Sequence, residues 1–456
     1  MTLATLAHVL DAPFIGADAE FSGVSTDTRT LNPADLFVAL TGPNHDGHDF
    51  LGEAARRGAA GALLARASKT VLPCVRVADT RRGLGALAAY WRRQFDLPVI
   101  AVTGSNGKTT VKEMIAAIMA ETGPGCATQG NLNNDIGAPL SLLRLRSRDR
   151  HAVIELGMNR QDEMRYLATM TQPTVAVVTN AAEAHLEGIG SVADVAREKG
   201  EVFSALGPAG IAIINADDDY ADLWRSCAVP RRCITFGLQR RADVSAEYQL
   251  ETTGSALRIK TTQGEIDMRL PLLGQHNVAN ALAAAASALA AGAEPGDVKR
   301  GVEKLRQISG RLELKQGING ARIIDDTYNA NPASLSAGIA VLRDFPGEAV
   351  LVMGDMVELG EAGPDIHRRV GTLAKRVGIA HLFAIGELSK LAVESFGAGA
   401  RHFPAREALV ESLVARMHAE MTILIKGSRC MHMEHVLREI VKPSSEHAPT
   451  ASLDNA

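Results

Sequence analysis

The run TGSNGKTT at residues 103–110 constrains this chain most, because it follows the apolar run LPVIAV and precedes the helical pattern VKEMIAAIMAE. A strand, a glycine-containing turn and a Lys-Thr pair at a helix start direct backbone N–H groups and the helix dipole at phosphate oxygens. The long form of this loop needs Gly at position 102, where Val102 stands, so the match is to a shorter TGxxGKT form. We therefore expect nucleotide phosphates at Gly104, Ser105, Asn106, Gly107, Lys108, Thr109 and Thr110.

Composition limits the classes of protein that could carry this loop. A chain of 456 residues, 46% hydrophobic and 22% charged, is long enough for about two to four packed domains. A net charge of −4 and an aromatic content of 4% argue against a nucleic-acid partner. The first residues lack a signal-peptide pattern, no apolar run is long enough to span a membrane, and the five cysteines lack metal-ligand spacing. We expect a cytoplasmic enzyme that is not embedded in a membrane.

Apolar runs predict three α/β domains. Residues 1–81 are expected to form a small N-terminal domain, and residues 82–310 a central P-loop domain with a mostly parallel sheet. The alternating pattern over 244–273 predicts an antiparallel meander on one edge of that sheet. Residues 311–456 predict an open, Rossmann-like sheet that binds ligands at the carboxyl ends of its strands, with a disordered tail from about residue 443.

Polar residues near the ends of the central strands are candidates for metal binding. The Thr109 hydroxyl is placed to bind Mg²⁺, and Glu155 ends the second central strand, where an acid can hold the same ion. His185 follows the third strand at the same edge, beside the phosphate loop, which favours a functional histidine over a structural one. Lys199 lies between two acids, and its neighbours alone favour a solvated surface side chain.

Further polar motifs lie near the junction with the third domain and within it. Asn277 and Asn280 share one face of a helix, where two amides suit either an adenine edge or a helix cap. Arg311 stands at the domain junction, where a guanidinium could stabilise phosphoryl charge. A phosphate loop alone does not separate a GTPase switch, a kinase and a ligase, but the Asn-Lys-x-Asp guanine signature is absent. The motifs DDTYNANPAS (325–334) and GDMVELG (354–360) both follow strands.

Together these motifs resemble the Mur ligase family of bacterial peptidoglycan synthesis, over essentially the whole chain. The branch is indicated by NLNNDIGAPL, NAAEAHLEGIGS, DDTYNANPAS, GDMVELG and KGSR, and by the absence of the Thr-Thr-Pro and Asp-Tyr-Ala-His-Thr-Pro runs of the diaminopimelate- or lysine-adding relative. The resemblance implies three domains: one for the UDP end of the substrate, a central ATPase and a C-terminal Rossmann-like domain. It also implies an ATP-dependent, ADP-forming ligase that joins D-alanyl-D-alanine to UDP-N-acetylmuramoyl-tripeptide through an acyl phosphate.

The resemblance implies a role for each candidate residue. Lys108, Glu155, His185 and Lys199 would be catalytic, and two Mg²⁺ ions would be held by Thr109, Glu155, His185 and Lys199, the last as a carbamate. ATP would contact, besides the phosphate loop, Asn277, Asn280, Arg311, Asp326, Tyr328 and Asn329. The UDP-sugar tripeptide would lie near Ser25, Thr26, Asp27, Thr28, Arg29, Asn44, Asp46, Gly47, His48, Asn133, Asn134 and Asp135.

Two other interpretations remain open at the level of sequence. One is another Mur-like amide ligase with a different amino-acid substrate, such as a folylpolyglutamate or cyanophycin-type enzyme. The complete first domain, with its runs STDTR and NHDGH, argues for a UDP-sugar substrate instead. The other is a P-loop ATPase that uses hydrolysis as a switch for a protein partner. We expect a monomer whose partners are its small-molecule substrates.

Overall fold

The computed structural model describes residues 1–184 and 186–442, so the predicted tail lies outside the described residues. The chain divides into two compact units. The first comprises residues 1–249, 256–270 and 277–305, and the second comprises residues 250–255, 271–276 and the chain from Arg306 onward. No helix in the described part of the chain is long and apolar enough to cross a membrane.

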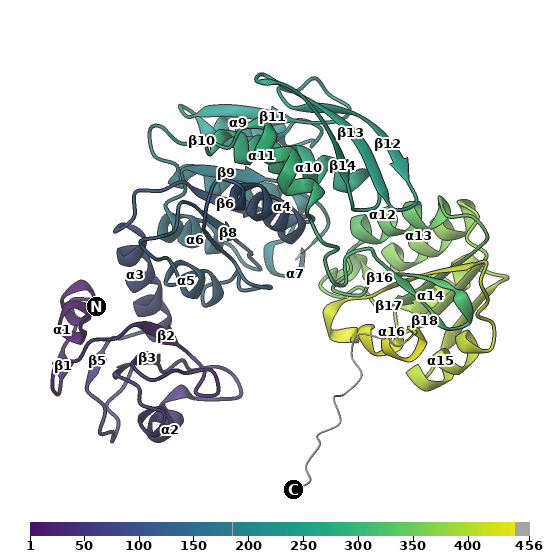
Figure 1. Ribbon diagram of the computed structural model, residues 1–456. Helices are drawn as coiled ribbons and strands as arrows, with labels where there is room; N and C mark the ends of the chain where they lie inside the picture. Colours follow the sequence, from purple (N-terminus) through teal and green to yellow (C-terminus); the bar gives the residue numbers. More distant parts are fainter. Residues whose placement is uncertain (185, 443–456) are drawn as a thin grey trace, which may run out of the picture. The chain divides into compact units, whose positions relative to one another are not determined.

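A five-stranded sheet at the N-terminus belongs to the first unit, with strand order β1-β5-β4-β3-β2 (Figure 1). β1 pairs antiparallel with β5, and the other neighbours are parallel. Every residue of β3 and β4 is buried, which explains their continuous apolar runs. The elements are α1 (Leu3–Val9), β1 (Phe14–Ile15), β2 (Gly23–Ser25), β3 (Asp35–Val38), η1 (Gly47–Phe50), α2 (Leu51–Arg56), β4 (Gly61–Leu64) and β5 (Cys74–Arg76).

The central sheet of the first unit has six strands in the order β11-β10-β9-β6-β8-β7, and every neighbouring pair is parallel. The prediction of a mostly parallel central sheet is confirmed. Its strands are β6 (Val99–Thr103), β7 (Cys126–Ala127), β8 (Ala152–Glu155), β9 (Val175–Val178), β10 (Ile211–Asn215) and β11 (Arg232–Phe236). Its helical segments are α4 (Lys108–Ala120), α5 (Gly137–Leu142), α6 (Glu163–Thr171), α7 (Leu186–Ile189), α8 (Val192–Gly200), η2 (Glu201–Ala205), α9 (Ala221–Ala228), α10 (Gln275–Ala290) and α11 (Pro295–Glu303).

β6 is the strand from which this sheet grows in both directions, because it lies between β8 and β9. The chain therefore leaves β6 toward one side of the sheet and later returns to the other. In open α/β sheets, ligands bind outside the carboxyl ends of the strands at such a switch point. The phosphate loop, Glu155 and the loop after β9 all lie at these carboxyl ends.

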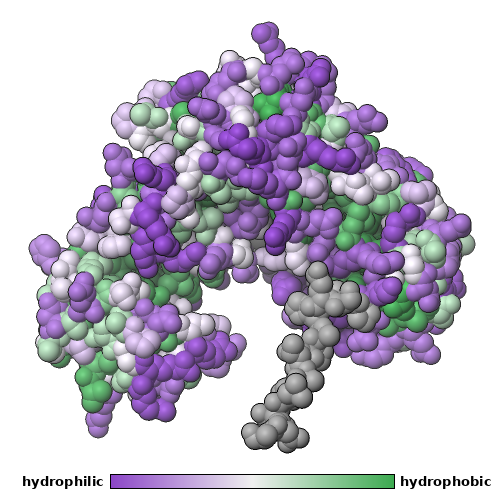
Figure 2. All heavy atoms as spheres, viewed as in Figure 1, coloured by the Kyte–Doolittle hydropathy of each residue, from purple (hydrophilic) through white to green (hydrophobic). Residues whose placement is uncertain are grey.

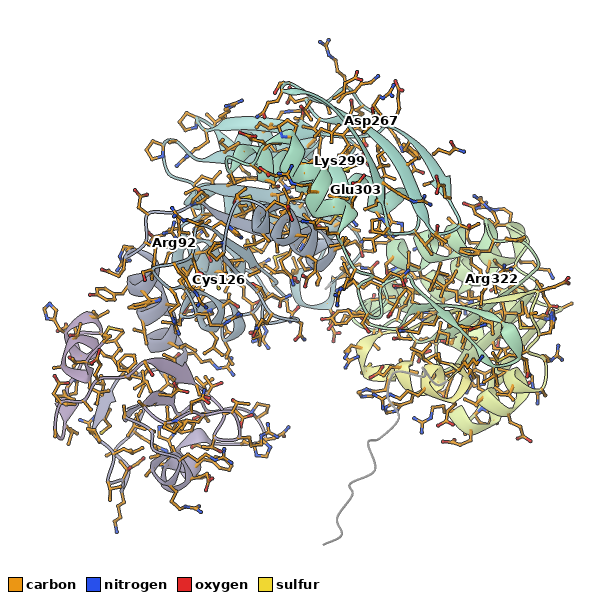
Figure 3. All side chains as sticks on the ribbon, in the orientation of Figure 1. Arg92, Cys126, Asp267, Lys299, Glu303 and Arg322 are labelled. Atoms are coloured by element: carbon orange, nitrogen blue, oxygen red, sulfur yellow. The ribbon has the colours of Figure 1, made fainter. Side chains whose placement is uncertain are left out.

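Helix α3 (Thr80–Arg92) links the first sheet to the central sheet and crosses the predicted boundary at residues 81 and 82. Its Leu84, Leu87 and Ala88 belong to a single apolar core that includes residues of both sheets. The Arg92 guanidinium is buried and donates hydrogen bonds to the carbonyl oxygens of Thr171 and Gln172 at the end of α6, both at 3.2 Å (Figure 3). The exact domain boundaries remain a prediction.

The predicted meander over 244–273 forms a separate three-stranded sheet, so its placement on an edge of the central sheet is wrong. Its strands are β12 (Ser245–Glu251), β13 (Gly254–Thr261) and β14 (Gly264–Leu270). The alternating sequence gives this sheet one apolar face, and β14 packs against α11. The other face carries ion pairs such as Arg258–Asp267 and Lys260–Glu247, and Figure 2 shows a mostly hydrophilic surface there.

Helix α11 connects this small sheet to the helix that follows the phosphate loop. Lys299 donates a hydrogen bond to the Asp267 carbonyl oxygen at 2.6 Å and pairs with Glu303 at 3.0 Å (Figure 3). On α11, Gly301 lies so close to α4 that an added Cβ would be 2.4 Å from the Ile118 Cα atom. The small sheet therefore supports α4 through α11.

The second unit contains a six-stranded sheet in the order β15-β16-β20-β17-β18-β19, antiparallel only at β15–β16 among the described strands. The predicted Rossmann-like sheet is confirmed, although β15 and β19 were not predicted. Its strands are β15 (Glu313–Gln316), β16 (Arg322–Asp326), β17 (Glu348–Gly354), β18 (His381–Ile385), β19 (Ala400–Phe403) and β20 (Met421–Lys426). Its helical segments are η3 (Ile318–Gly320), α12 (Pro332–Arg343), η4 (Gly360–Ala362), α13 (Gly363–Arg376), α14 (Ser389–Phe396), α15 (Arg406–Val414), η5 (Arg429–Met431) and α16 (Glu434–Ile440).

Candidate active site

The phosphate loop requires glycine at two positions. Gly104 and Gly107 have positive φ angles of 149° and 81°. A Cβ atom at Gly104 would lie 1.8 Å from Thr179 Oγ1, and one at Gly107 would lie 2.4 Å from Asn280 Oδ1. α4 begins at Lys108, and the N–H groups of a first helical turn have no partner within their own helix. The loop therefore has the backbone of a phosphate-binding turn.

Two residues after β9 hold this loop in shape, and the sequence analysis did not identify them. Asn180 accepts hydrogen bonds from the Ser105 N–H through its carbonyl oxygen at 2.9 Å and from the Asn106 N–H through Oδ1 at 3.0 Å. Thr179 Oγ1 and Asn180 Nδ2 donate to the Asn106 carbonyl oxygen at 2.6 and 3.1 Å. Asn180 begins the motif NAAEAHLEGIGS, in which the sequence predicted a site role only for His185.

The Lys108 ammonium group lies over the phosphate loop. Its Nζ atom donates to the carbonyl oxygens of Gly104 at 2.7 Å and Ser105 at 3.3 Å. A lysine in this position brings a positive charge to the phosphates that the loop would hold. The side chain is half-buried, so solvent screens this charge less than it would screen a surface lysine.

Glu155 and Thr109 form the described part of a candidate metal site. Thr109 Oγ1 donates to Glu155 Oε1 at 3.2 Å. Glu155 is 1% exposed, and its Oε2 atom is buried without a hydrogen bond from any described residue. A buried carboxylate oxygen without a donor suits a cation, and Mg²⁺ commonly uses one or two carboxylates together with substrate phosphates. The residues present therefore fit Mg²⁺.

The expectation from sequence that Lys199 is a solvated surface residue is wrong, because its side chain is 1% exposed. Its two acidic neighbours turn away from it: Glu198 accepts from the Met164 N–H at 3.0 Å, and Glu201 pairs with Arg165 at 3.0 Å. Burial, and then the Lys108 charge, hold the pKa of the Lys199 amine well below its ordinary value. The amine is therefore more readily neutral than a surface lysine. His185 lies outside the described residues.

The two amides on α10 lie together, as their spacing predicts. Asn280 Nδ2 donates to Asn277 Oδ1 at 2.9 Å, and both residues are buried. Asn277 is the third residue of α10 and Asn280 is its sixth, so Asn280 lies too far into the helix to cap its first turn. Asn280 also lies against Gly107 of the phosphate loop. Asn280 therefore does not cap the helix, and the adenine contact of the two amides remains a prediction.

In the second unit, the predicted ligand residues gather at the carboxyl ends of β16 and β20. Asp326 pairs with Lys426 at 2.6 Å, and burial raises the pKa of the Asp326 carboxyl although Lys426 opposes this. Lys426 Nζ also donates to the Asn329 carbonyl oxygen at 2.8 Å. The Arg311 guanidinium lies 4.3 Å from the centre of the Tyr328 ring. The structure thus brings Arg311, Tyr328, Asn329 and Asp326 to one end of this sheet.

The two motifs of the first sheet, the runs STDTR and NHDGH, lie at or beyond the ends of the neighbouring strands β2 and β3. Ser25 Oγ donates to the Asp27 carbonyl oxygen at 2.9 Å, and Asp27 pairs with the exposed Arg29 at 2.6 Å. His48 receives the Ala65 N–H at its Nε2 atom at 3.0 Å, so its Nδ1–H donates to Asp46 Oδ1 at 2.6 Å. Thr28 is buried, whereas Asn44 is exposed.

Hydrogen bonds to Asp46 explain the second of these motifs, the run NHDGH. The N–H and ring of His48, with Arg66, hold the pKa of the Asp46 carboxyl well below its ordinary value. Gly47 leaves room for the chain, because a Cβ atom there would lie 2.7 Å from the Leu40 backbone nitrogen. Asp46, Gly47 and His48 therefore shape this loop, and their predicted substrate contacts remain a prediction. Arg29 and Asn44 are the exposed members of the predicted uridine-side set.

The three polar residues of the run NLNNDIG have different environments. Asn133 Nδ2 donates to Glu155 Oε1 at 2.7 Å. Asn134 Oδ1 accepts from the N–H groups of Ile136 at 3.2 Å and Gly137 at 2.9 Å, so it stabilises the start of α5. Asp135 pairs with Arg81 of α3 at 3.1 Å. The predicted substrate contacts of these residues remain a prediction.

His276 predicts a pH dependence of stability. Burial, with the nearby Lys426 charge, lowers its pKa from 6.5 to about 4. As pH falls through 6.5, the unfolded chain takes up a proton before the folded chain does, so the free energy of unfolding decreases until about pH 4. The slope is at most about 1.4 kcal/mol per pH unit, and less where solvent reaches the ring. As pH is lowered from about 7 to 5, the melting temperature of His276→Gln should fall by less than that of wild type. Equal losses in the two proteins would contradict this.

Comparison with known proteins identifies the family. Residues 102–288 match the Mur ligase middle domain, and residues 310–429 match the Mur ligase glutamate ligase domain. The chain is 43% identical over 445 residues to the UDP-N-acetylmuramoyl-tripeptide--D-alanyl-D-alanine ligase of Escherichia coli K12, which covers 96% of this chain and 98% of that one. The chain belongs to the Mur ligase family.

Solved Mur ligases share the whole architecture. A MurF crystal structure from Acinetobacter baumannii has a TM-score of 0.90 and 35% identity, covering 96% of this chain and 97% of that one. A MurF ligase from Thermotoga maritima in complex with ADP has a TM-score of 0.81 and 26% identity, covering 91% of this chain and 96% of that one. The three-domain Mur ligase fold expected from the sequence is thereby confirmed, and the chain is an ATP-dependent, ADP-forming ligase.

Proposed function

We propose that this chain joins D-alanyl-D-alanine to UDP-N-acetylmuramoyl-tripeptide with ATP, giving the pentapeptide precursor of peptidoglycan. The full-length similarity to the E. coli ligase of that name, at 43% identity, carries the proposal. The phosphate loop and the buried pair Thr109–Glu155 support it, because they suit phosphoryl transfer. The product feeds cell-wall synthesis, and the reaction takes place in the cytoplasm.

The reaction needs an activated carboxyl group, because a carboxylate is a poor electrophile. A terminal carboxylate oxygen of the tripeptide attacks the γ-phosphorus of ATP, the bond from that phosphorus to the β–γ bridging oxygen breaks, and ADP leaves. The amine nitrogen of D-alanyl-D-alanine then attacks the acyl carbon and loses a proton. Phosphate leaves from the tetrahedral intermediate with its bonding electrons, and the amide remains.

Residues of the first unit perform the positioning and charge stabilisation in this scheme. The phosphate loop, Gly104 to Thr110, holds the phosphates, and Lys108 moves from its loop carbonyls to the γ-phosphoryl oxygens. Glu155 and Thr109 would hold Mg²⁺, and the ion would supply positive charge to the phosphoryl oxygens. No nucleophilic side chain is required, so catalysis depends on orientation and electrostatics.

Lys199 is the proposed site of a carbamate. A neutral lysine amine adds to carbon dioxide, forming an N–C bond and releasing one proton, and the product is an anionic oxygen ligand. The burial of Lys199 and its lowered pKa support this modification, because the neutral amine is the reacting form. The carbamate and His185 would hold a second Mg²⁺, with His185 outside the described residues.

The remaining site residues keep their predicted roles as parts of the proposal. Asn277, Asn280, Arg311, Asp326, Tyr328 and Asn329 contact ATP, and the residues around Ser25–Arg29 contact the uridine end. Asn134 and Asp135 lie near the tripeptide, as the sequence predicts. We also propose that the enzyme acts as a monomer on small molecules, without nucleic acid or a protein switch partner.

The test is product formation with a panel of amines. The enzyme is incubated with ATP, Mg²⁺ and UDP-N-acetylmuramoyl-tripeptide, and each reaction contains D-alanyl-D-alanine, D-glutamate, L-lysine or L-glutamate. Mass spectrometry should show the new amide with D-alanyl-D-alanine. Equal or better product formation with a single amino acid would favour the alternative, a Mur-like ligase with a different amino-acid substrate. Parallel reactions with the lysine and diaminopimelate forms of the tripeptide identify the preferred third residue.

A further inference from the structure

Asn133 contacts the metal-site carboxylate from a loop that precedes α5. Its Nδ2 atom donates to Glu155 Oε1 at 2.7 Å, and its own carbonyl oxygen accepts from the Gly157 N–H at 2.8 Å. The direction of the side-chain bond follows from chemistry, because an ionised carboxylate can only accept. Asn133 thus bonds both to the last residue of β8 and to the chain two residues beyond it.

The two oxygens of Glu155 have different environments. Oε1 receives two donors, the Asn133 amide and the Thr109 hydroxyl, at 2.7 and 3.2 Å. Oε2 is buried and receives no hydrogen bond from any described residue. The backbone is also fixed, since the Glu155 N–H donates to Thr128 Oγ1 at 3.0 Å. This arrangement holds the carboxylate in one rotation and leaves Oε2 available to a cation.

Gly157 makes room for Asn133. A Cβ atom at Gly157 would lie 2.7 Å from Asn133 Oδ1 and 2.8 Å from Asn133 Cγ, both closer than van der Waals contact allows. Its φ angle is not among the positive ones, so the backbone itself would accept alanine. The Asn133 side chain is therefore what excludes a larger residue at position 157, and Gly157→Ala should displace that side chain.

We propose that Asn133 is a positioning residue for Glu155, which orients Oε2 toward the divalent cation of the nucleotide complex, rather than a contact of the UDP-sugar substrate. The proposal rests on the proposed function only in taking a metal–nucleotide complex as the ligand. Removing a residue that orients a metal ligand typically lowers metal affinity by about 10- to 100-fold. Asn133 shares this task with Thr109, which is itself a proposed ligand.

The test measures metal binding without the ligase reaction. Mn²⁺ is titrated into the full chain with saturating ADP, and bound Mn²⁺ is followed by electron paramagnetic resonance. Asn133→Leu removes the amide at nearly the same size, and Gly157→Ala displaces it while Asn133 stays. Asn131→Ala is the matched control, because Asn131 is an exposed residue of the same loop. ADP affinity is measured in parallel with a chelator present.

We expect the Mn²⁺ dissociation constant to rise about 10- to 100-fold in Asn133→Leu and by a smaller factor in Gly157→Ala, with metal-free ADP affinity within about twofold of wild type. Asn131→Ala should bind Mn²⁺ like wild type. Unchanged Mn²⁺ affinity in Asn133→Leu would overturn the proposal, as would an equal loss in Asn131→Ala. A raised KM for the UDP-sugar with normal Mn²⁺ binding would return Asn133 to the substrate site. Failure of wild type to bind ADP would count against the proposed function instead.

Discussion

Lys108→Ala should lower kcat/KM for ATP by about a thousandfold, because the variant loses the positive charge that faces the transferring phosphoryl group. The Lys108 ammonium already lies at the phosphate loop, and when ATP binds it exchanges its bonds to the Gly104 and Ser105 carbonyl oxygens for bonds to phosphoryl oxygens. The loss should fall mainly on kcat if Lys108 acts on the transition state, and on KM if it acts only in binding. Steady-state kinetics with all substrates present make this distinction.

Lys108→Arg is the control for charge alone. It keeps a cation in the same place, but its broad planar group does not reproduce the compact ammonium of lysine. Activity between that of wild type and Lys108→Ala is expected. Near-normal kcat in Lys108→Ala, with the protein folded by circular dichroism, would contradict the assignment of Lys108 to phosphoryl transfer.

Lys199→Met should lower turnover by about 100-fold or more while the melting temperature stays at or above that of wild type. Methionine matches the length of the lysine stem, and it removes a buried amine whose protonated form is unfavourable at this position. A residue that served only the fold would show the opposite pattern, with lost stability and retained turnover in the folded fraction. Differential scanning calorimetry and steady-state kinetics on the same preparation separate the two.

The proposed carbamate on Lys199 can be tested directly by spectroscopy. Wild type equilibrated with ¹³C-bicarbonate should show a carbamate resonance by ¹³C nuclear magnetic resonance, and Lys199→Met should lack it. Removal of carbon dioxide should lower wild-type activity, and bicarbonate should restore it. A fully active wild-type enzyme with no carbamate resonance in the presence of bicarbonate would contradict the modification.

Much of the fold follows from the sequence because the strands of a parallel sheet are buried on both faces. Their apolar runs are continuous, as at Ile100–Val102, so the long buried strands can be located along the chain, whereas short strands such as β7 and β19 were not predicted. The small sheet over 244–273 was misplaced for the opposite reason. Its alternating pattern shows one apolar face but not which partner covers that face, and the partner is α11.

Residues of the candidate site could be predicted from sequence where a residue type at a given motif position has a single known role. Gly104, Gly107 and Lys108 belong to that class. Lys199 does not, because the sequence places it between two acids, and only the fold shows that these acids turn toward α6. Thr179 and Asn180 were missed because their bonds to the phosphate loop join residues far apart in the chain. Short motifs report local geometry, whereas such bonds depend on the order of strands in the sheet.

The central claim is that ATP turnover is coupled to amide formation, and substrate omission tests it most directly. ADP release is followed with ATP and Mg²⁺ in four reactions: both cosubstrates present, either one omitted, and neither present. Steady ADP release should require both UDP-N-acetylmuramoyl-tripeptide and D-alanyl-D-alanine, with at most a single turnover when the dipeptide alone is missing. Rapid, continuous ADP release in the absence of both cosubstrates would contradict the claim and indicate an ATPase that is not a ligase.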